Sequence, residues 1–281
     1  NTLENGIIRI ALPPSSSDRK LALFSASSSN TITFADDVEF IDLTQIDPEF
    51  IVLFSRQLTT SSSGQNWIQE YVDYRNDNPY NSFSSTSIEI GKLYDQFSYG
   101  QRFHPMSIRN FGHWAVKNWT KPQHLFIIGK GREYRNMRTP DQVDNLLYQT
   151  FFIPTFGFPG SDNLLLGSTN SAVPIFSIGR LAATDGDMVG AYLNKVQAFE
   201  AAVANSQQSI EDREWLKRVM HLGGGGDQFE QQSIKDHLLG MEQIIENNQF
   251  GGDVTSFYKT SSDPVETSQS TALKSLINDG I

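Results

Sequence analysis

The distribution of apolar and polar residues between positions 87 and 130 predicts a short strand followed by an amphipathic helix. Ser87–Ile90 alternates small and apolar side chains, as a short strand does, and Tyr94–Gly100 is expected to form a loop. Pro105 favours a first helical turn, because the missing N–H of proline costs nothing there. Four apolar residues then recur at steps of three and four and define one buried helix face: Ile108, Phe111, Ala115 and Trp119.

An unbroken apolar run follows this helix. Pro122 ends the helix, and His124–Gly129 has the composition of a strand covered on both faces, which is typical of a parallel sheet. Strand, helix and strand therefore form a βαβ unit. Comparable patterns predict two further strands of the same sheet, Phe50–Phe54 and Val173–Ile178, and two further helices, Asn66–Arg75 and Asp187–Ala204.

Two short polar segments lie next to these helices. Residues 59–64, with the sequence TTSSSG, have the composition of a mobile loop. Thr184 and Asp187 have the spacing of a capping box at the start of the helix Asp187–Ala204.

The chain divides by pattern into three parts. Residues 1–46 contain four short apolar or alternating segments, which predict a small β-segment that ends an upstream domain: residues 7–12, 20–26, 30–34 and 38–43. Residues 47–212 are expected to form a first α/β subdomain. Residues 213–281 begin a second one, with strands at Arg218–Leu222 and Val254–Tyr258 and a helix face carrying Leu238, Met241 and Ile245. The predicted fold is therefore α/β: a parallel sheet with flanking helices after a β-segment, and an incomplete second subdomain.

Composition excludes several classes of function. The chain carries 22 Lys and Arg against 32 Asp and Glu, and its net charge of −10 argues against nucleic acid as a partner. No apolar run approaches the roughly 20 residues of a membrane helix. Cysteine is absent, which excludes disulfides, zinc–thiolate sites and a cysteine nucleophile within these residues. Because Asn1 is not a start residue, the chain is expected to be a piece of a longer protein.

Two glycine-rich segments fail the tests for nucleotide binding. Counted from Gly223, the dinucleotide fingerprint requires glycine at the sixth position, where Gln228 stands. A phosphate-binding loop of the Walker type requires Lys-Ser/Thr after its last glycine, where Asp227 stands, and Gly129–Gly131 fails in the same way. A flexible strand-to-helix turn explains Gly223–Gly226 better.

The sequence signals for metal ligands and for catalytic residues are equally weak. Asp185–Asp187 resembles the start of a calcium loop, but Val189 and Val196 would occupy its fifth and twelfth positions and cannot ligate. Helix capping explains the two aspartates better. No G-x-S-x-G elbow places a serine on a strand-to-helix turn.

The five histidines lack the H-E-x-x-H spacing of a zinc site: His104, His113, His124, His221 and His237. We expect His113 to be half-buried and hydrogen-bonded and His221 to lie within a strand, both in structural roles. Glu133 and Asp162 lie in loops after strand ends, where α/β sheets bind ligands. The residues alone therefore assign no catalytic, cofactor-binding or metal-binding residue.

Several segments, taken in order, resemble the gingipain-type cysteine peptidases. Six segments match that family in order and spacing: YDQFSYG, SIRNF, NWTKP, a strand ending in glycine, IGRLA after Pro174, and LKRVMHLGGGGD. Residues 7–26 are similar to the region that precedes the peptidase domain in the type IX secretion sortases of the family. One position departs from the pattern, because many relatives place Asp where this chain has Lys130.

The resemblance implies a caspase-like fold of two α/β subdomains. The family's catalytic His follows a strand of the second subdomain in a Gly-His pair, and the catalytic Cys comes later. Residues 275–281 resemble the run-up to that strand, so the catalytic pair is expected downstream and no catalytic residue is assigned here. The resemblance also admits calcium as a cofactor, although no ligand motif supports it.

The resemblance also implies where the protein acts. It implies an exported protein that is secreted or associated with the outer membrane at the cell surface. The implied partners are protein or peptide substrates, the remainder of the chain's own peptidase domain, and components of a secretion system.

Three functions are compared on this basis. The first is the N-terminal portion of a cysteine endopeptidase or sortase that acts on exported proteins. The alternative is a non-catalytic surface scaffold or binding module on the same fold, which Lys130 and the glycine run favour. A nucleotide-binding α/β protein is disfavoured by the failed fingerprints.

Overall fold

The computed structural model describes residues 2–4, 7–9, 14, 16, 38–132, 151–168, 171–204, 209, 211–260 and 267–278. The chain forms two compact units, residues 1–41 and residues 42–281. The division into three parts after residues 46 and 212 stays a prediction.

The first unit contains a small antiparallel pair of strands, β1 (Thr2–Glu4) and β2 (Ile7–Arg9). Of the four predicted segments, residues 7–12 contain β2, and residues 20–26 and 30–34 lie outside the described residues. The strand predicted at residues 38–43 is wrong. The Asp42 carboxylate accepts a hydrogen bond from the backbone N–H of Thr44 at 3.0 Å and caps a short 3-10 helix, η1 (Leu43–Gln45).

Four parallel strands form the main sheet of the second unit: β3 (Phe50–Phe54), β4 (Ser85–Glu89), β5 (His124–Ile128) and β6 (Ser177–Leu181). Their order is β4-β3-β5-β6, which confirms the predicted parallel sheet. The two central strands are the most apolar, and Ile51, Leu53 and Ile127 are wholly buried. Strand β6 starts later than predicted, because Pro174 lacks an N–H for the ladder and Val173 is 72% exposed.

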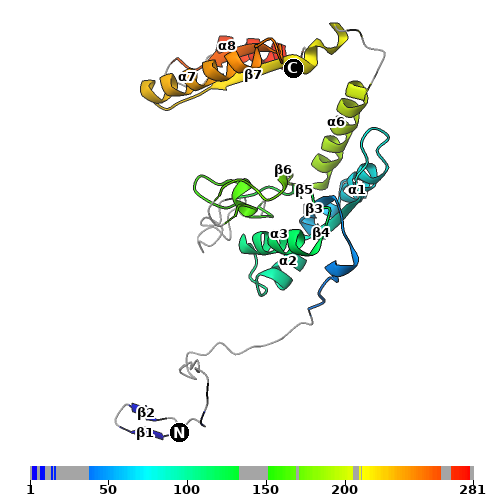
Figure 1. Cartoon of the computed structure of the whole chain (residues 1–281), viewed down its shortest axis with the longest axis vertical. Helices are drawn as coiled ribbons and strands as arrows, with labels where there is room; N and C mark the ends of the chain where they lie inside the picture. Colours follow the sequence, from blue (N-terminus) through cyan, green and yellow to red (C-terminus); the bar gives the residue numbers. More distant parts are fainter. Residues whose placement is uncertain are drawn as a thin grey trace. The chain divides into compact units, whose positions relative to one another are not determined.

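Helices cover both faces of this sheet (Figure 1). Helices α1 (Trp67–Asp77) and α6 (Gly186–Ala204) lie on one face, and α2 (Ile90–Phe97) and α3 (Met106–Asn118) lie on the other. On the first face the Tyr71 ring stacks on Phe126 at 5.1 Å. On the second, the predicted α3 face is confirmed, with Ile108, Phe111 and Ala115 wholly buried.

The loop predicted at residues 94–100 is wrong in its first half, because α2 extends through Phe97. Ile90, Leu93 and Tyr94 recur at three- and four-residue spacing and are buried, and the Glu89 side chain caps the helix by accepting from the Gly91 N–H at 2.9 Å. The glycine and aromatic content of the segment concealed this short amphipathic pattern.

The predicted cap of α6 is also wrong. The residue that caps it is Asp185, whose Oδ1 accepts from the Met188 N–H at 2.9 Å. Asp187 instead accepts from the backbone N–H and the hydroxyl of Ser62, at 3.1 and 3.0 Å. These bonds attach the loop of residues 59–64, predicted to be mobile, to the first turn of α6.

The second half of the unit is a further βαβ motif, as predicted. Strands β7 (Arg218–Gly223) and β8 (Asp253–Tyr258) are parallel, helix α7 (Gln228–Ile245) connects them, and α8 (Thr267–Asn278) follows. Asp227 caps the start of α7 by accepting from the Glu230 N–H, and the Glu230 side chain accepts from the N–H of Gly226, the residue before the cap. The glycine run is therefore a strand-to-helix turn, in which Gly225 has a φ of 127°.

Candidate functional site

The carboxyl ends of the four parallel strands meet at one edge of the sheet. The chain passes from β3 outward to β4 and then crosses to the other side of β3 to form β5. The connections therefore diverge between β3 and β5, and open α/β sheets bind ligands outside the carboxyl ends of their strands at such a point.

A cavity of about 570 Å³ opens at this edge, and we call it the edge cavity. Its walls come from the residues after β3, the start of α2, the turn before α3 and the segment after residue 150. The lining residues are Ser55, Arg56, Gln57, Glu89, Ile90, Gly91, Tyr94, Arg102, Phe103, Phe151 and Phe152. The sheet edge therefore carries a cavity with aromatic walls and charged groups.

Cations are concentrated around the edge cavity. Within the described part of the chain, Arg56 has no acidic partner at ion-pair distance, and the closest pairing of Arg102 is 3.6 Å to Asp95. The Lys130 ammonium and the Arg132 guanidinium lie 5.4 and 5.1 Å from the centre of the Phe151 ring. Four basic side chains thus gather at one edge of a protein whose net charge is −10.

A tyrosine whose hydroxyl is buried, Tyr94, also lines the edge cavity. Tyr94 is only 3% exposed, and its hydroxyl has no hydrogen-bond partner among the described residues. Burial raises the pKa of Tyr94 above its ordinary value, so the hydroxyl keeps its proton and remains a donor. The nearby backbone N–H of Phe103 lowers the pKa of Tyr94, but burial outweighs it. This N–H does not form a hydrogen bond with the Tyr94 hydroxyl.

The predicted ligand-facing residue Asp162 has a structural role instead. Its two carboxylate oxygens accept from Arg180 Nε and Nη2, each at 2.8 Å. The remaining Arg180 donors reach the carbonyls of Gly129, Ile153 and Pro154, so all five N–H groups are bonded. Glu133, the other predicted residue, lies outside the described residues.

The histidines do not form a catalytic site within the described part of the chain. The prediction for His113 is wrong, because its side chain is exposed on the outer face of α3. His221 lies in β7 as predicted and is buried, and its Nδ1 has no partner among described residues. His124 Nδ1 lies 2.6 Å from the Ser177 hydroxyl, and burial together with the nearby Arg75 lowers the pKa of His124.

The described residues contain no group of three or more His, Cys, Asp or Glu side chains that could hold a metal ion. The same residues contain no helix long and apolar enough to cross a membrane.

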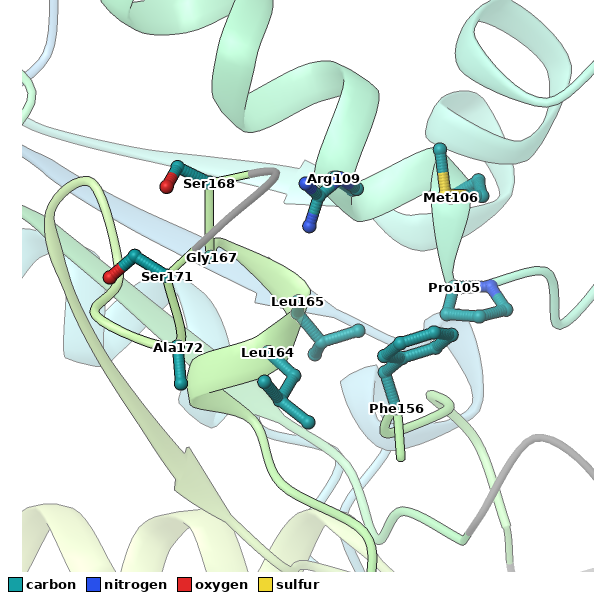
Figure 2. Close-up of a pocket in the computed structure, with 10 residues that line it drawn as sticks. All are labelled: Pro105, Met106, Arg109, Phe156, Leu164, Leu165, Gly167, Ser168, Ser171 and Ala172. Carbon is teal, nitrogen blue, oxygen red and sulfur yellow. The ribbon is translucent and has the colours of Figure 1, made fainter. Parts of the chain in front are cut away.

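A second cavity, of about 370 Å³, lies between the start of α3 and residues 156–168 and 171–172 (Figure 2). Most of its lining is apolar, including Met106, Phe156 and Leu164, and Arg109 is the charged residue among the side chains that line it. The 3-10 helix η4 (Asn163–Leu165) supplies two of its leucines.

Residues 44–281 match the sequence model of peptidase family C25, the gingipain family. The chain belongs to this family. The match covers most of the chain and confirms the family predicted from the ordered segments. Together with the parallel sheet and its flanking helices, it supports the predicted gingipain-like α/β fold.

The solved structure of dimeric latent PorU from Porphyromonas gingivalis is similar to this chain. The similarity has a TM-score of 0.46 at 15% sequence identity and covers 64% of this chain. The chain spans about 20% of the length of that protein. No curated protein matches the chain.

Sequence reasoning did not find the edge cavity. Arg56 and Arg102 lie in segments without a motif, and the sequence pattern places Tyr94 in a loop. One signal was available, because two of the lining segments directly follow the predicted strands Phe50–Phe54 and Ser87–Ile90.

Proposed function

We propose that this chain is the N-terminal portion of a gingipain-type cysteine endopeptidase or sortase that acts on exported proteins at the cell surface. The observation that carries the proposal is the match of residues 44–281 to the peptidase family. The family's secreted or surface location supports the proposed place of action.

The chemistry of such an enzyme requires a thiolate that attacks the peptide carbonyl, an imidazole that transfers the proton, and backbone N–H groups that hold the oxyanion. These 281 residues contain no cysteine, so the proposal places the nucleophile on another part of the protein. The chemistry itself needs no resident cofactor. The residues described here would provide packing and one wall of the substrate cleft.

The hydrogen bonds at the carboxyl edge of the sheet support the role of a rigid wall of the substrate cleft. Arg180 fixes the end of β5 to the segment of residues 153–162 through all five of its donors. Backbone bonds continue this connection, since the Phe152 N–H donates to the Lys130 carbonyl at 2.9 Å. A substrate lying against this edge would therefore meet pre-organised backbone.

The alternative proposal is a non-catalytic surface scaffold on the same fold. Lys130 favours it, because the family places an acidic residue at this position in many relatives and this chain places a cation. Both proposals share the fold and the cell-surface location, and they differ in the presence of a working thiol downstream.

The experiment is to purify the natural protein that contains this sequence and to measure cleavage of a mixed peptide library with and without iodoacetamide. The peptidase proposal expects cleavage that iodoacetamide abolishes, whereas residues 1–281 alone should cleave nothing. Absence of cleavage by the natural protein would favour the scaffold, and cleavage that resists iodoacetamide would contradict a thiol mechanism. Limited proteolysis of intact cells tests the surface location separately.

A further inference from the structure

We propose that the edge cavity binds a peptide through a carboxylate, supplied by an acidic side chain or by the C-terminus of the peptide. The proposal does not depend on the peptidase function proposed above, because it rests on the lining of this cavity alone.

The charges at the edge cavity favour an anion. Two of its lining residues are basic, Arg56 and Arg102, and one is acidic, Glu89. A guanidinium binds a carboxylate through two parallel hydrogen bonds, which are stronger than those between neutral groups. The exposed Arg56 side chain has no acidic partner among the described residues, so binding a ligand would break no existing ion pair.

The acidic residue in the lining already has a structural role. Glu89 Oε1 accepts from the Gly91 N–H at 2.9 Å and caps α2. A Cβ on Gly91 would lie 2.7 Å from Glu89 Oε2 and 2.9 Å from Arg102 Nη1. Glycine at this position therefore allows Arg102 to reach into the cavity beside the cap.

The Tyr94 hydroxyl is the strongest evidence for a ligand. A buried hydroxyl without a partner destabilises a fold, and native proteins seldom retain one. Tyr94 lines the edge cavity, and its hydroxyl is buried and has no partner in the described part of the chain. A ligand carboxylate oxygen would accept its proton and remove this penalty.

The walls of the cavity fit a peptide rather than a small inorganic anion. Phe103, Phe151 and Phe152 line the cavity and would pack against the apolar parts of a peptide. Phe103 has a φ of 56°, a left-handed conformation that is rare for a bulky residue, and this conformation places its ring 6.0 Å from that of Tyr94. A cavity of about 570 Å³ accommodates two or three side chains.

The test is calorimetric titration of the 281-residue chain with three seven-residue peptides that share a central Phe-X-Phe. In the first, X is Glu and the C-terminus is amidated. In the second, X is Gln and the C-terminus is free. In the third, X is Gln and the C-terminus is amidated. We expect the first or the second peptide to bind at least about tenfold tighter than the third, because a charge-assisted hydrogen bond contributes about 1.5–3 kcal/mol. The tighter of the two identifies the source of the carboxylate.

Two variants test whether the peptide binds in the edge cavity. Arg56→Gln is expected to weaken carboxylate-dependent binding about tenfold. Tyr94→Phe is expected to weaken it several-fold while leaving the urea midpoint unchanged or raised, since the lost hydroxyl has no partner within the described part of the protein. Arg109→Gln, at the cavity of Figure 2, is the matched control and should change nothing.

Three results would overturn the proposal. They are equal affinity for all three peptides, no binding of any peptide at millimolar concentration, and carboxylate-dependent binding that neither cavity variant weakens. A Tyr94→Phe variant that lost stability would also contradict it, because the hydroxyl would then have a structural partner.

Discussion

Arg180 and Asp162 form a bidentate ion pair at the carboxyl edge of the sheet, with Nε 2.8 Å from Oδ2 and Nη2 2.8 Å from Oδ1. The Arg180 side chain is 9% exposed, and its other donors hold three backbone carbonyls. One guanidinium therefore joins β6, the end of β5 and the segment that continues from the wall of the edge cavity.

Arg180→Lys is expected to destabilise the protein by about 3–5 kcal/mol, because lysine cannot make the planar set of five bonds and leaves buried acceptors unpaired. Urea unfolding measures the loss. The control is Arg102→Lys, since that side chain is 58% exposed and its pair with Asp95 is long, so a change below about 1 kcal/mol is expected. Equal effects of the two variants would contradict the structural role of Arg180.

Phe111→Ala is expected to cost about 3–5 kcal/mol. Phe111 is wholly buried, and its ring makes edge-to-face contacts with Trp119 and Phe97, each at 5.7 Å. Val116→Ala, on the outer side of the same helix at 43% exposure, is the control and should cost less than about 0.5 kcal/mol. A small effect of Phe111→Ala on the unfolding midpoint would show that another face of α3 packs on the sheet.

Glu200 is expected to make stability depend on pH below about 4.5. Burial raises the pKa of Glu200, but hydrogen bonds from Tyr74 and Arg75 outweigh burial and hold that pKa below its ordinary value of 4.5. The ionised carboxylate therefore stabilises the contact between α1 and α6 above pH 4.5, and this stabilisation is lost as the pH falls through the lower pKa of the folded state. Urea midpoints measured from about pH 6 to pH 3 should fall less steeply for Glu200→Gln than for the wild type. Identical slopes would exclude Glu200 as a contributor.

The outer surface of α7 is expected to drive self-association of the 281-residue polypeptide. No residue of α7 is buried, and Met241 and Ile244 are 53% and 69% exposed. Exposed apolar side chains that lie close together on a helix mark a surface that binds protein. Sedimentation at increasing concentration should show association that Ile244→Glu weakens.

The control for this prediction is Gln243→Glu, which adds the same charge at the neighbouring position, where the side chain is exposed and already polar. It removes no apolar surface, so association should weaken less than with Ile244→Glu. A monomer at all concentrations would contradict the prediction, and equal effects of the two variants would attribute the change to charge alone.

The sequence by itself determined the sheet and most of its helices. Phe50–Phe54 and His124–Ile128 are short apolar runs, which is typical of parallel strands covered on both faces, and the spacing of Ile108, Phe111 and Ala115 fixes a helix face. The order of weak segments along the chain also indicated the family. These properties are local patterns or sums of local patterns, so they can be read without coordinates.

Only the tertiary structure decided which polar groups meet. Asp187 has the spacing of a helix cap, yet it bonds Ser62, which is 125 positions away, while Asp185 makes the cap. Asp162 lies in a loop of the kind that binds ligands, yet Arg180 occupies both of its oxygens. The edge cavity brings together residues between Ser55 and Phe152, and its unpaired Tyr94 hydroxyl has no sequence signal. Hydrogen bonds and ion pairs act over a few ångströms between residues distant in sequence, so packing rather than local pattern determines them.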